Sequence, residues 1–309
     1  IVEGLKAFLD TTVLGYANAT DSYKEAVCAW MKRRHNWDAK PEWILPSHGV
    51  VDAFFSAIKC YTNEGDGVML LTPVYYPMYI GIKVNNRVLV DCPLVERGDT
   101  YEIDFEDFEK KAKDPNTKLF ILCSPHNPLG IVWTREELER MCHICIANNV
   151  LIVSDEIHSD LVFHGKKHIP TATLSPEIAA HVISCISGTK TFNLAGLQAS
   201  ATIFPNQELK ARFDKFWFNL DIHRNNAFST IAMEVAFNEG EEWLEQLLGY
   251  IGGNFEFIKD YCAANIPQVK PNVPDATYLV WLDCRGLGMG NEELRDFMIR
   301  KAGLGLNEG

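Results

Sequence analysis

The sequence has little positive charge for its size and no long apolar run. Among 309 residues, 29 lysines and arginines stand against 41 aspartates and glutamates, which gives a formal net charge of −12. A protein that binds a phosphate backbone needs a basic face, so this balance argues against a nucleic-acid partner. No apolar run approaches the roughly 18 residues that span a bilayer, and residues 1–5 show no signal-peptide pattern. We therefore expect neither nucleic-acid nor membrane binding.

The nine cysteines form no framework of paired spacings. Several lie inside apolar segments, as Cys123 does in residues 120–123 and Cys185 does in residues 183–185. Free thiols of this kind are typical of the core of a protein in a reducing compartment. We therefore expect buried thiols and a cytoplasmic location.

Repeats, low-complexity tracts and long linkers are also absent, and the pattern that is present is an alternation. Short β-branched runs lie between longer segments of helical periodicity, which is typical of βα units around a mostly parallel sheet. The sequence thus predicts an α/β fold with a mostly parallel central sheet flanked by helices. Thr134 with Glu137 is a potential capping box, and Asp104 is a potential helix cap. The predicted strands are 67–71, 87–90, 118–123, 150–155, 182–186 and 198–204, and the predicted helices include 50–61, 104–113, 134–148 and 207–219.

The pattern changes near Glu241. A long helical stretch is followed by three prolines, a predicted strand at 276–283 and a predicted helix at 291–302. We interpret 241–309 as a smaller α+β C-terminal domain, 16–240 as the large domain and 1–15 as an N-terminal helix or linker. Because the chain starts within a helical pattern and stops just after a strand-like segment at 304–306, we expect a fragment whose C-terminal domain is truncated.

Chemically active side chains follow four of the predicted strands. In an open parallel sheet, ligands bind at the carboxyl ends of the strands. These strands are 67–71, 118–123, 150–155 and 182–186. Tyr75 follows the first, Asn127 follows the second, and Lys190 follows the last, with two hydroxyl residues before it. The third itself ends in Asp155, with His158 three residues further on. Four strand ends therefore present an aromatic ring, an amide, a carboxylate and an amine.

Together these groups match the needs of one cofactor, pyridoxal 5′-phosphate. Its aldehyde requires a lysine amine, with which it forms a Schiff base. Its pyridine nitrogen acts as an electron sink only when a carboxylate keeps it protonated. Its phenolic oxygen needs a donor, its phosphate needs hydroxyls and free backbone N–H groups, and its ring is commonly stacked on an aromatic side chain.

Five stretches carry a family resemblance: SPHNPLG, VSDEIHSDLVFHG, SGTKTFNLAGLQAS, TPVYYPMY and ATYLVWLDCRGLGM. With them the sequence resembles the fold-type-I pyridoxal-phosphate enzymes of the aminotransferase class I/II superfamily. The segments DEIHSDL and KTFNLAGLQ make it similar, more narrowly, to the cystathionine β-lyase-like C–S lyases related to bacterial regulators of maltose metabolism. The five stretches are distributed between residues 72 and 289, so the resemblance extends over most of the chain.

The resemblance implies a role for each candidate residue. Lys190 would hold the cofactor as a Schiff base and carry protons during turnover, and Asp155 would pair with the pyridinium nitrogen. Asn127 would donate to the phenolic oxygen, His158 would lie near the same edge, and Tyr75 would stack on the ring.

The resemblance also implies how the phosphate is held. Ser187 and Thr189 would contact it together with the backbone of Gly49 and Val50. These last two open a helix whose dipole and unpaired N–H groups favour an anion. Tyr16 would reach the phosphate from the partner subunit, so the implied assembly is a homodimer with a shared active site.

The sequence departs from the family pattern in two respects. Gln198 stands where many members have an arginine that clamps the phosphate, which agrees with the lyase branch and leaves more of the anion binding to hydroxyls and the helix. The arginine that grips the substrate carboxylate in this family would lie beyond residue 309, and a segment that lines the substrate entrance would precede residue 1.

Each candidate also has a purely structural interpretation. Lys190 alone would be read as a solvated surface residue, and Asp155 alone as a helix cap. His158 is open to the interpretation of a hydrogen-bonded histidine beneath the cofactor, and Tyr75 to that of a core residue. For Tyr16, spacing alone says nothing about reach into another subunit. The four strand ends taken together favour the cofactor site.

Three other motifs point to no further ligand. Cys142, His143 and Cys145 share one helical turn, from which they do not all face one metal ion. Residues 286–290 are rich in glycine, but Asn291 departs from the dinucleotide fingerprint. Residues 188–191 lack the preceding glycine and the Gly-Lys pair of a phosphate loop.

The function that the resemblance implies is that of a pyridoxal-phosphate-dependent carbon–sulfur β-lyase. Its substrate would be a small amino acid, cystathionine or another cysteine S-conjugate, and its products a thiol, pyruvate and ammonia. Two alternatives stay open. An aminotransferase would use the same residues and would differ in whether a β-leaving group departs. A regulatory protein would keep the lyase fold in order to bind a protein partner.

Overall fold

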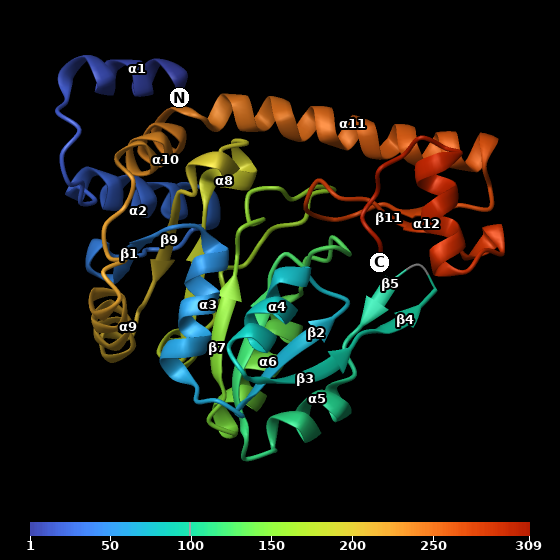
Figure 1. Cartoon of the computed structure of the whole chain (residues 1–309), viewed down its shortest axis with the longest axis horizontal. Helices are drawn as coiled ribbons and strands as arrows, with labels where there is room; N and C mark the ends of the chain where they lie inside the picture. Colours follow the sequence, from blue (N-terminus) through green and yellow to red (C-terminus); the bar gives the residue numbers. More distant parts are fainter. Residues whose placement is uncertain (99) are drawn as a thin grey trace.

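A seven-stranded sheet forms the centre of the structure, a computed structural model that describes residues 1–98 and 100–309 (Figure 1). The strand order is β1-β9-β8-β7-β6-β2-β3. The five strands from β8 to β3 are parallel, whereas β9 runs antiparallel to β8 and β1 antiparallel to β9. The predicted α/β class with a mostly parallel sheet is confirmed. The strands are β1 Ile44–Ser47, β2 Gly67–Thr72, β3 Val88–Pro93, β6 Thr117–Cys123, β7 Leu151–Asp155, β8 Val182–Ile186 and β9 Ser200–Ile203.

Helices cover both faces of the sheet because its central strands are apolar on both sides. Every residue of β2 and of β8 is buried, as expected for parallel strands between two helical layers. Successive side chains alternate between the faces. Met69 and Leu71 join the core formed with α2, α5, α6 and α10, and Val68 and Leu70 join the core formed with α3, α4 and α9. These helices are α2 Asp21–His35, α3 Val50–Tyr61, α4 Tyr76–Val84, α5 Phe105–Ala112, α6 Arg135–Ala147, α9 Gln207–Asn219 and α10 Ala227–Glu239.

The capping signals in the sequence locate the helix ends closely. Helices α3 and α9 have the predicted bounds. Thr134 and Glu137 form the predicted capping box at the start of α6, and the Asp104 side chain caps α5. The predictions of 104–113 and 134–148 extend beyond α5 and α6 only by such flanking residues.

Strands at the sheet margins differ more from the prediction. The predicted strand 87–90 continues to Pro93 in β3. The predicted strand 198–204 is shorter in β9, because Gln198 adopts a left-handed backbone conformation with φ of 51°. Strand β1 and the antiparallel pair β4 (Val95–Arg97) and β5 (Thr100–Glu102) are absent from the prediction.

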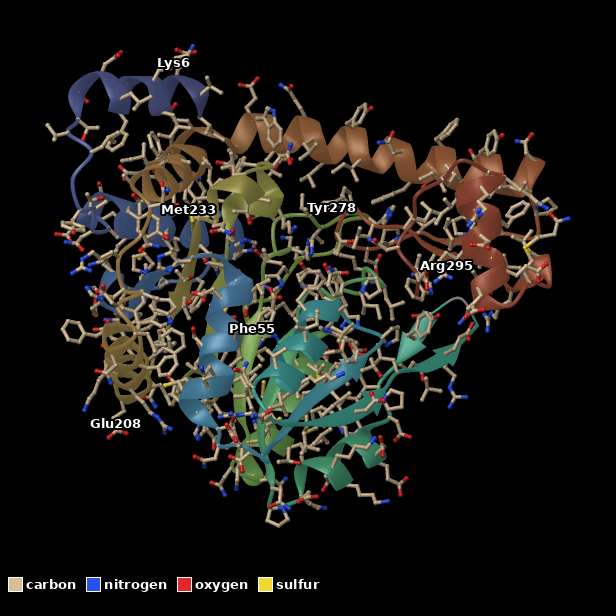
Figure 2. The ribbon with its side chains drawn as sticks, in the orientation of Figure 1. Lys6, Phe55, Glu208, Met233, Tyr278 and Arg295 are labelled. Atoms are coloured by element: carbon tan, nitrogen blue, oxygen red, sulfur yellow. The ribbon has the colours of Figure 1, made fainter. Side chains whose placement is uncertain are left out.

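Shorter elements complete the large layered body. Helix α1 (Val2–Thr11) packs on α10 with Phe8 edge-to-face against Phe228, their ring centroids 5.9 Å apart. Side chains fill the layers between helices and sheet, and the Tyr23 hydroxyl lies 3.6 Å from Sδ of Met233, which is labelled in Figure 2. The remaining short helices are α7 Pro176–Ala179 and α8 Gly188–Thr191. No helix among the described residues is long and apolar enough to cross a membrane.

The C-terminal segment begins with the 25-residue helix α11 (Glu241–Asn265), which runs along one side of the molecule (Figure 1). At its far end, β10 (Lys270–Asn272) pairs antiparallel with β11 (Trp281–Asp283), next to α12 (Asn291–Arg300).

The predicted strand 276–283 is wrong over its first half. Ala276 instead forms an isolated bridge with Val162, and Thr277 has a positive φ of 71°, so this stretch turns back onto the large body. Residues 304–306 form no strand. The division into segments at residues 16 and 241 stays a prediction.

Gly130 joins the SPHNPLG loop to the C-terminal segment, and we predict that Gly130→Ala destabilises the fold more than Gly165→Ala. Both glycines have φ near +70°, which costs an L-residue about 1–2 kcal/mol. A Cβ at Gly130 would lie 2.2 Å from Cβ of Pro274 and 2.8 Å from the Ala276 oxygen, whereas a Cβ at Gly165 meets nothing within 4 Å. Urea unfolding of both variants measures the difference, and equal losses would contradict the close approach.

Candidate active site

The four strands that precede the candidate residues are neighbours in the sheet. Their order is β8-β7-β6-β2, and all four are parallel. Their carboxyl ends therefore meet at one edge. Asp155, the last residue of β7, stands in register between Cys123 of β6 and Cys185 of β8, whose thiols are both buried.

Asp155 is a buried carboxylate with few partners. It is 3% exposed, and within the described residues its one hydrogen bond comes from the backbone N–H of Ile157, at 3.1 Å from Oδ1. The pKa of Asp155 is raised to about 7, chiefly by burial; the charge of Glu156 contributes to the increase, whereas the Ile157 N–H and Lys190 oppose it. The site therefore favours a cation beside this carboxylate.

His158 and Asn127 face each other across the ends of β7 and β6. Nδ2 of Asn127 lies 3.5 Å from Nε2 of His158. His158 is 2% exposed, and its Nδ1 is buried without a partner among the described residues. Burial, aided by the positive charge of Lys190, lowers the pKa of His158 to about 3, so its ring is neutral near pH 7. A buried neutral ring with an open nitrogen is able to accept or donate one further hydrogen bond.

Lys190 belongs to α8, directly after β8, and its side chain is half-buried. Its positive charge lowers the pKa of both Asp155 and His158, which places its amine among these groups. Asp155, Asn127, His158 and Lys190 are thus brought together as the sequence predicts, although their roles stay predictions.

The hydroxyls of Ser187 and Thr189, which precede Lys190, make hydrogen bonds within the protein. The Ser187 hydroxyl donates to the Ala199 carbonyl at 2.6 Å and accepts from the Thr189 N–H at 2.9 Å, which caps α8. The Thr189 hydroxyl lies 2.7 Å from Oγ of Ser187. Because the Ser187 proton is directed at the Ala199 carbonyl, the Thr189 hydroxyl donates to Oγ of Ser187, and it would have to leave that bond to donate to an anion.

The start of α3 is a helix terminus whose backbone N–H groups have no side-chain cap. Gly49, with φ of 101°, is the N-cap residue of α3, which begins at Val50, and no side chain caps this helix. Its own N–H donates to Oγ of Ser200 at 2.8 Å, and this serine also contacts Ser47 at 2.7 Å. For the predicted contact with a phosphate, the Gly49 N–H would have to leave Ser200 and donate to the phosphate instead. Val50 is the first residue of the helix, as predicted. Ser200 was outside the sequence prediction because only the β1–β9 pairing brings it to Gly49.

The aromatic candidates differ in position. Tyr75 is half-buried at the start of α4, and its N–H donates to the Asn127 carbonyl at 3.1 Å, so it lies next to the site. Tyr278, which is labelled in Figure 2, contacts the His158 ring edge-to-face at 5.8 Å. The quoted stretch ATYLVWLD contains this tyrosine, so its signal was present in the sequence.

Tyr16 lies apart from the other candidates. It is 95% exposed, with the Arg224 guanidinium over its ring at 5.3 Å. Within one chain it does not join the site, and its predicted role depends on a second copy.

The residues present fit pyridoxal 5′-phosphate. Asp155 offers a buried anionic partner for a protonated ring nitrogen, Asn127 and His158 offer polar atoms at the same edge, and Lys190 offers an amine. The uncapped start of α3 offers backbone N–H groups for a phosphate.

Comparison with known proteins places the chain in a family. The model for aminotransferase class I and II matches residues 3–304, and the chain belongs to this family. It is 42% identical to cystathionine β-lyase PatB of Bacillus subtilis over all 309 residues and 80% of that protein. It is 29% identical to protein MalY of Escherichia coli, with 97% of this chain and 77% of that protein covered.

Solved structures agree with this assignment. Cystalysin from Treponema denticola, which contains a pyridoxal 5′-phosphate cofactor, has a TM-score of 0.98 and 39% identity over 100% of this chain and 78% of that one. The pyridoxal-phosphate-bound C–S lyase from Staphylococcus hominis has a TM-score of 0.93 and 32% identity over 100% and 78%. The predicted family, its lyase branch, the pyridoxal-phosphate cofactor and the enzymatic nature of the chain are confirmed.

The raised pKa of Asp155 predicts a pH-dependent effect of Asp155→Asn on the cofactor-free protein. An ordinary aspartate titrates near about 3.9, whereas Asp155 titrates at about 7 in the fold. The folded wild type therefore holds an extra proton between these values and loses stability as the pH rises through them. The variant should match wild type near about pH 4 and exceed its unfolding free energy above about pH 7, by at most about 4 kcal/mol.

Urea unfolding across this pH range measures the difference. Asp214→Asn, at an exposed position, is the control and should show no such trend. A constant difference between Asp155→Asn and wild type at all pH values would contradict the buried, unpaired carboxylate.

Proposed function

We propose that this chain catalyses β-elimination on cystathionine and other cysteine S-conjugates, with release of a thiol, pyruvate and ammonia. The observation that carries the proposal is the meeting of Lys190, Asp155, Asn127 and His158 at one sheet edge. The relatives described as cystathionine β-lyases and C–S lyases support the substrate class.

The bound cofactor supplies an aldehyde that joins amines and a ring that withdraws electrons from the α-carbon of the amino acid. The amine of Lys190 would hold the aldehyde and, once displaced by substrate, take the α-proton as a general base. The Asp155 carboxylate would accept a hydrogen bond from the protonated ring nitrogen, and the positive charge of the ring would keep Asp155 ionised. Asn127 would donate through Nδ2 to the phenolic oxygen.

The phosphate end would be held by the start of α3 and by Thr189. The N–H groups there have no side-chain cap, and the helix dipole adds an attraction for the anion. With Gln198 in place of an arginine, binding would rest on these neutral donors.

We also propose a homodimer in the cytoplasm. Val13, Leu14 and Tyr16 are exposed apolar or aromatic residues near a hollow of about 280 Å³, lined by residues 14–17 and 224–228. Exposed apolar side chains gathered in this way favour association with another chain, and Tyr16 would then extend to the partner's phosphate. All nine cysteines are free, which supports a reducing compartment.

Aminotransfer is the second candidate function. The family description includes it, and a putative aminotransferase from Clostridium difficile has a TM-score of 0.96 and 43% identity over 99% of this chain and 79% of that one. Both reactions would use Lys190 in the same way. They differ in whether a thiolate leaves the β-carbon, so the product distinguishes them.

Lys190→Ala should abolish pyruvate formation from cystathionine, by about a thousandfold or more, because both the cofactor linkage and the general base are lost. The assay contains no added keto acid. Lys167→Ala, at an exposed lysine, is the matched control and should keep full activity. Wild-type conversion that requires a keto acid and yields no pyruvate would instead support the aminotransferase.

Tyr16→Phe should weaken binding of pyridoxal 5′-phosphate about tenfold, since it removes one hydrogen bond to a charged group. Titration of the cofactor-free protein measures the dissociation constant, and light scattering should find a dimer for both forms. Tyr250→Phe removes a hydroxyl from another exposed tyrosine, on α11, and should change nothing. A monomeric wild type, or an unchanged dissociation constant, would contradict the shared site.

A further inference from the structure

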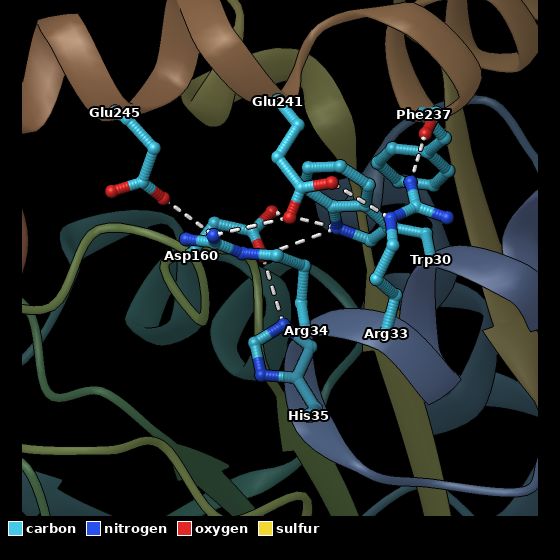
Figure 3. A network of polar contacts seen from close by, with 8 residues as sticks. All are labelled: Trp30, Arg33, Arg34, His35, Asp160, Phe237, Glu241 and Glu245. Carbon is cyan, nitrogen blue, oxygen red and sulfur yellow. Dashed lines mark hydrogen bonds and ion pairs between the residues drawn. The ribbon is translucent and has the colours of Figure 1, made fainter.

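A second buried carboxylate lies behind the active site. The side chain of Asp160, two residues after His158, is 3% exposed and accepts hydrogen bonds from three side chains. Nε1 of Trp30 lies 3.1 Å from Oδ1, and Nε2 of His35 lies 2.8 Å from the same oxygen, as Figure 3 shows. The Thr191 hydroxyl lies 2.8 Å from Oδ2. Both carboxylate oxygens are thus engaged, and one of the donors is the residue next to Lys190.

Asp160 is ionised although it is buried. Burial alone would raise its pKa, but the hydrogen bonds from His35 and Thr191 and the charges of His35 and Arg34 hold the pKa below its usual range. A carboxylate has no proton to give, so Trp30, His35 and Thr191 all act as donors toward it. The hydrogen of the Thr191 hydroxyl is therefore directed at Asp160 and fixed there.

The charged groups around Asp160 come from three sides. Helix α2 provides Arg34 and His35, and Arg34 pairs with Glu241 and Glu245 of α11 (Figure 3). The ring of His168 meets the ring of His35 edge-to-face at 5.5 Å.

His168 is in turn paired with Glu156, since its Nε2 lies 3.2 Å from Oε2 of that buried carboxylate. Glu156 also accepts from the Thr171 N–H and from the Ser184 hydroxyl. The buried side chains of Asp160, His35, His168 and Glu156 thus form a polar layer behind the site, in which each has a hydrogen-bond partner. Such a hydrogen-bonded network makes the geometry rigid.

Helix α8 needs this support because it is only one turn long. Its four residues, Gly188–Thr191, are too few for a helix to be stable through its own backbone bonds. Ser187 caps the first end, and the hydrogen bond from Thr191 to Asp160 holds the last. Lys190 lies between these two anchors, so its backbone position is set by both.

We propose that Asp160, acting through the Thr191 hydroxyl, is a positioning residue for Lys190. This inference rests on the proposed function, in which Lys190 holds the cofactor and moves the α-proton. Loss of the hydroxyl leaves Lys190 chemically intact but loosens the turn that presents it, and small errors of placement have a large effect on proton transfer.

The test compares Thr191→Val, which keeps the shape and deletes the hydroxyl, with Thr191→Ser, which keeps the hydroxyl. For Thr191→Val we expect kcat to fall by about tenfold to a hundredfold with KM nearly unchanged. The dissociation constant for pyridoxal 5′-phosphate, measured on the cofactor-free protein, should rise by at least about fivefold, because the turn that presents the Lys190 amine to the cofactor is looser. Thr191→Ser should restore both values to near wild type.

Thr117→Val is the matched control, because Thr117 is also buried and donates one hydrogen bond, to the Lys111 carbonyl. It should lose stability in urea as Thr191→Val does, with kcat and cofactor binding unchanged. Asp160→Asn, which keeps the volume and removes the charge, should change kcat in the same direction as Thr191→Val and serves if the latter does not fold.

The outcomes separate the two proposals. If wild type neither binds pyridoxal 5′-phosphate nor is trapped at Lys190 by borohydride, the proposed function fails. If wild type does both and Thr191→Val behaves like Thr117→Val in kcat and cofactor binding, the positioning role is overturned while the proposed function stands.

Discussion

The burial of Asp155 is the constraint on which the site depends. An ionised carboxylate away from water is costly unless a positive charge or several hydrogen bonds compensate it. Here the sheet surrounds it with Cys123 and Cys185, and one backbone N–H reaches it. Within the described chain the nearby cation is the Lys190 amine, the group that the proposed function assigns to the cofactor aldehyde. A protonated ring nitrogen would restore the balance, because a cation beside Asp155 favours its ionised form.

Much of this arrangement was predictable because central parallel strands are buried on both faces. Strands β2, β6, β7 and β8 are almost continuously apolar and end abruptly in polar residues, and both signals are visible in the sequence. Their adjacency then follows from the βα connections, which bring the four carboxyl ends to one edge. Helix ends were equally visible where a side chain such as Thr134 or Asp104 caps the first turn.

The parts that escaped prediction depend on pairing between distant segments. Strand direction is not encoded in composition, so the antiparallel entry of β9 and the short β1 beside it left no local signal. The contact of Ser200 with Gly49 exists only through that pairing. Likewise Ala276 leaves the predicted strand because the large body offers it a bridge to Val162. Tyr278, carried by the same turn, reaches His158 for this reason.

Asp155 and Glu156 are adjacent acidic residues at the end of β7, and their side chains lie on opposite sides of the strand. Successive side chains of an extended strand point in opposite directions, so Glu156 joins His168 and Ser184 while Asp155 faces the site. His168 and other hydrogen bonds hold the pKa of Glu156 low despite burial, so it remains charged. The negative charge of Glu156 raises the pKa of Asp155, so that Asp155 needs a nearby cation all the more to remain ionised. The polar layer behind the sheet edge thus acts on the front of the site electrostatically through Glu156 and mechanically through Asp160 and Thr191.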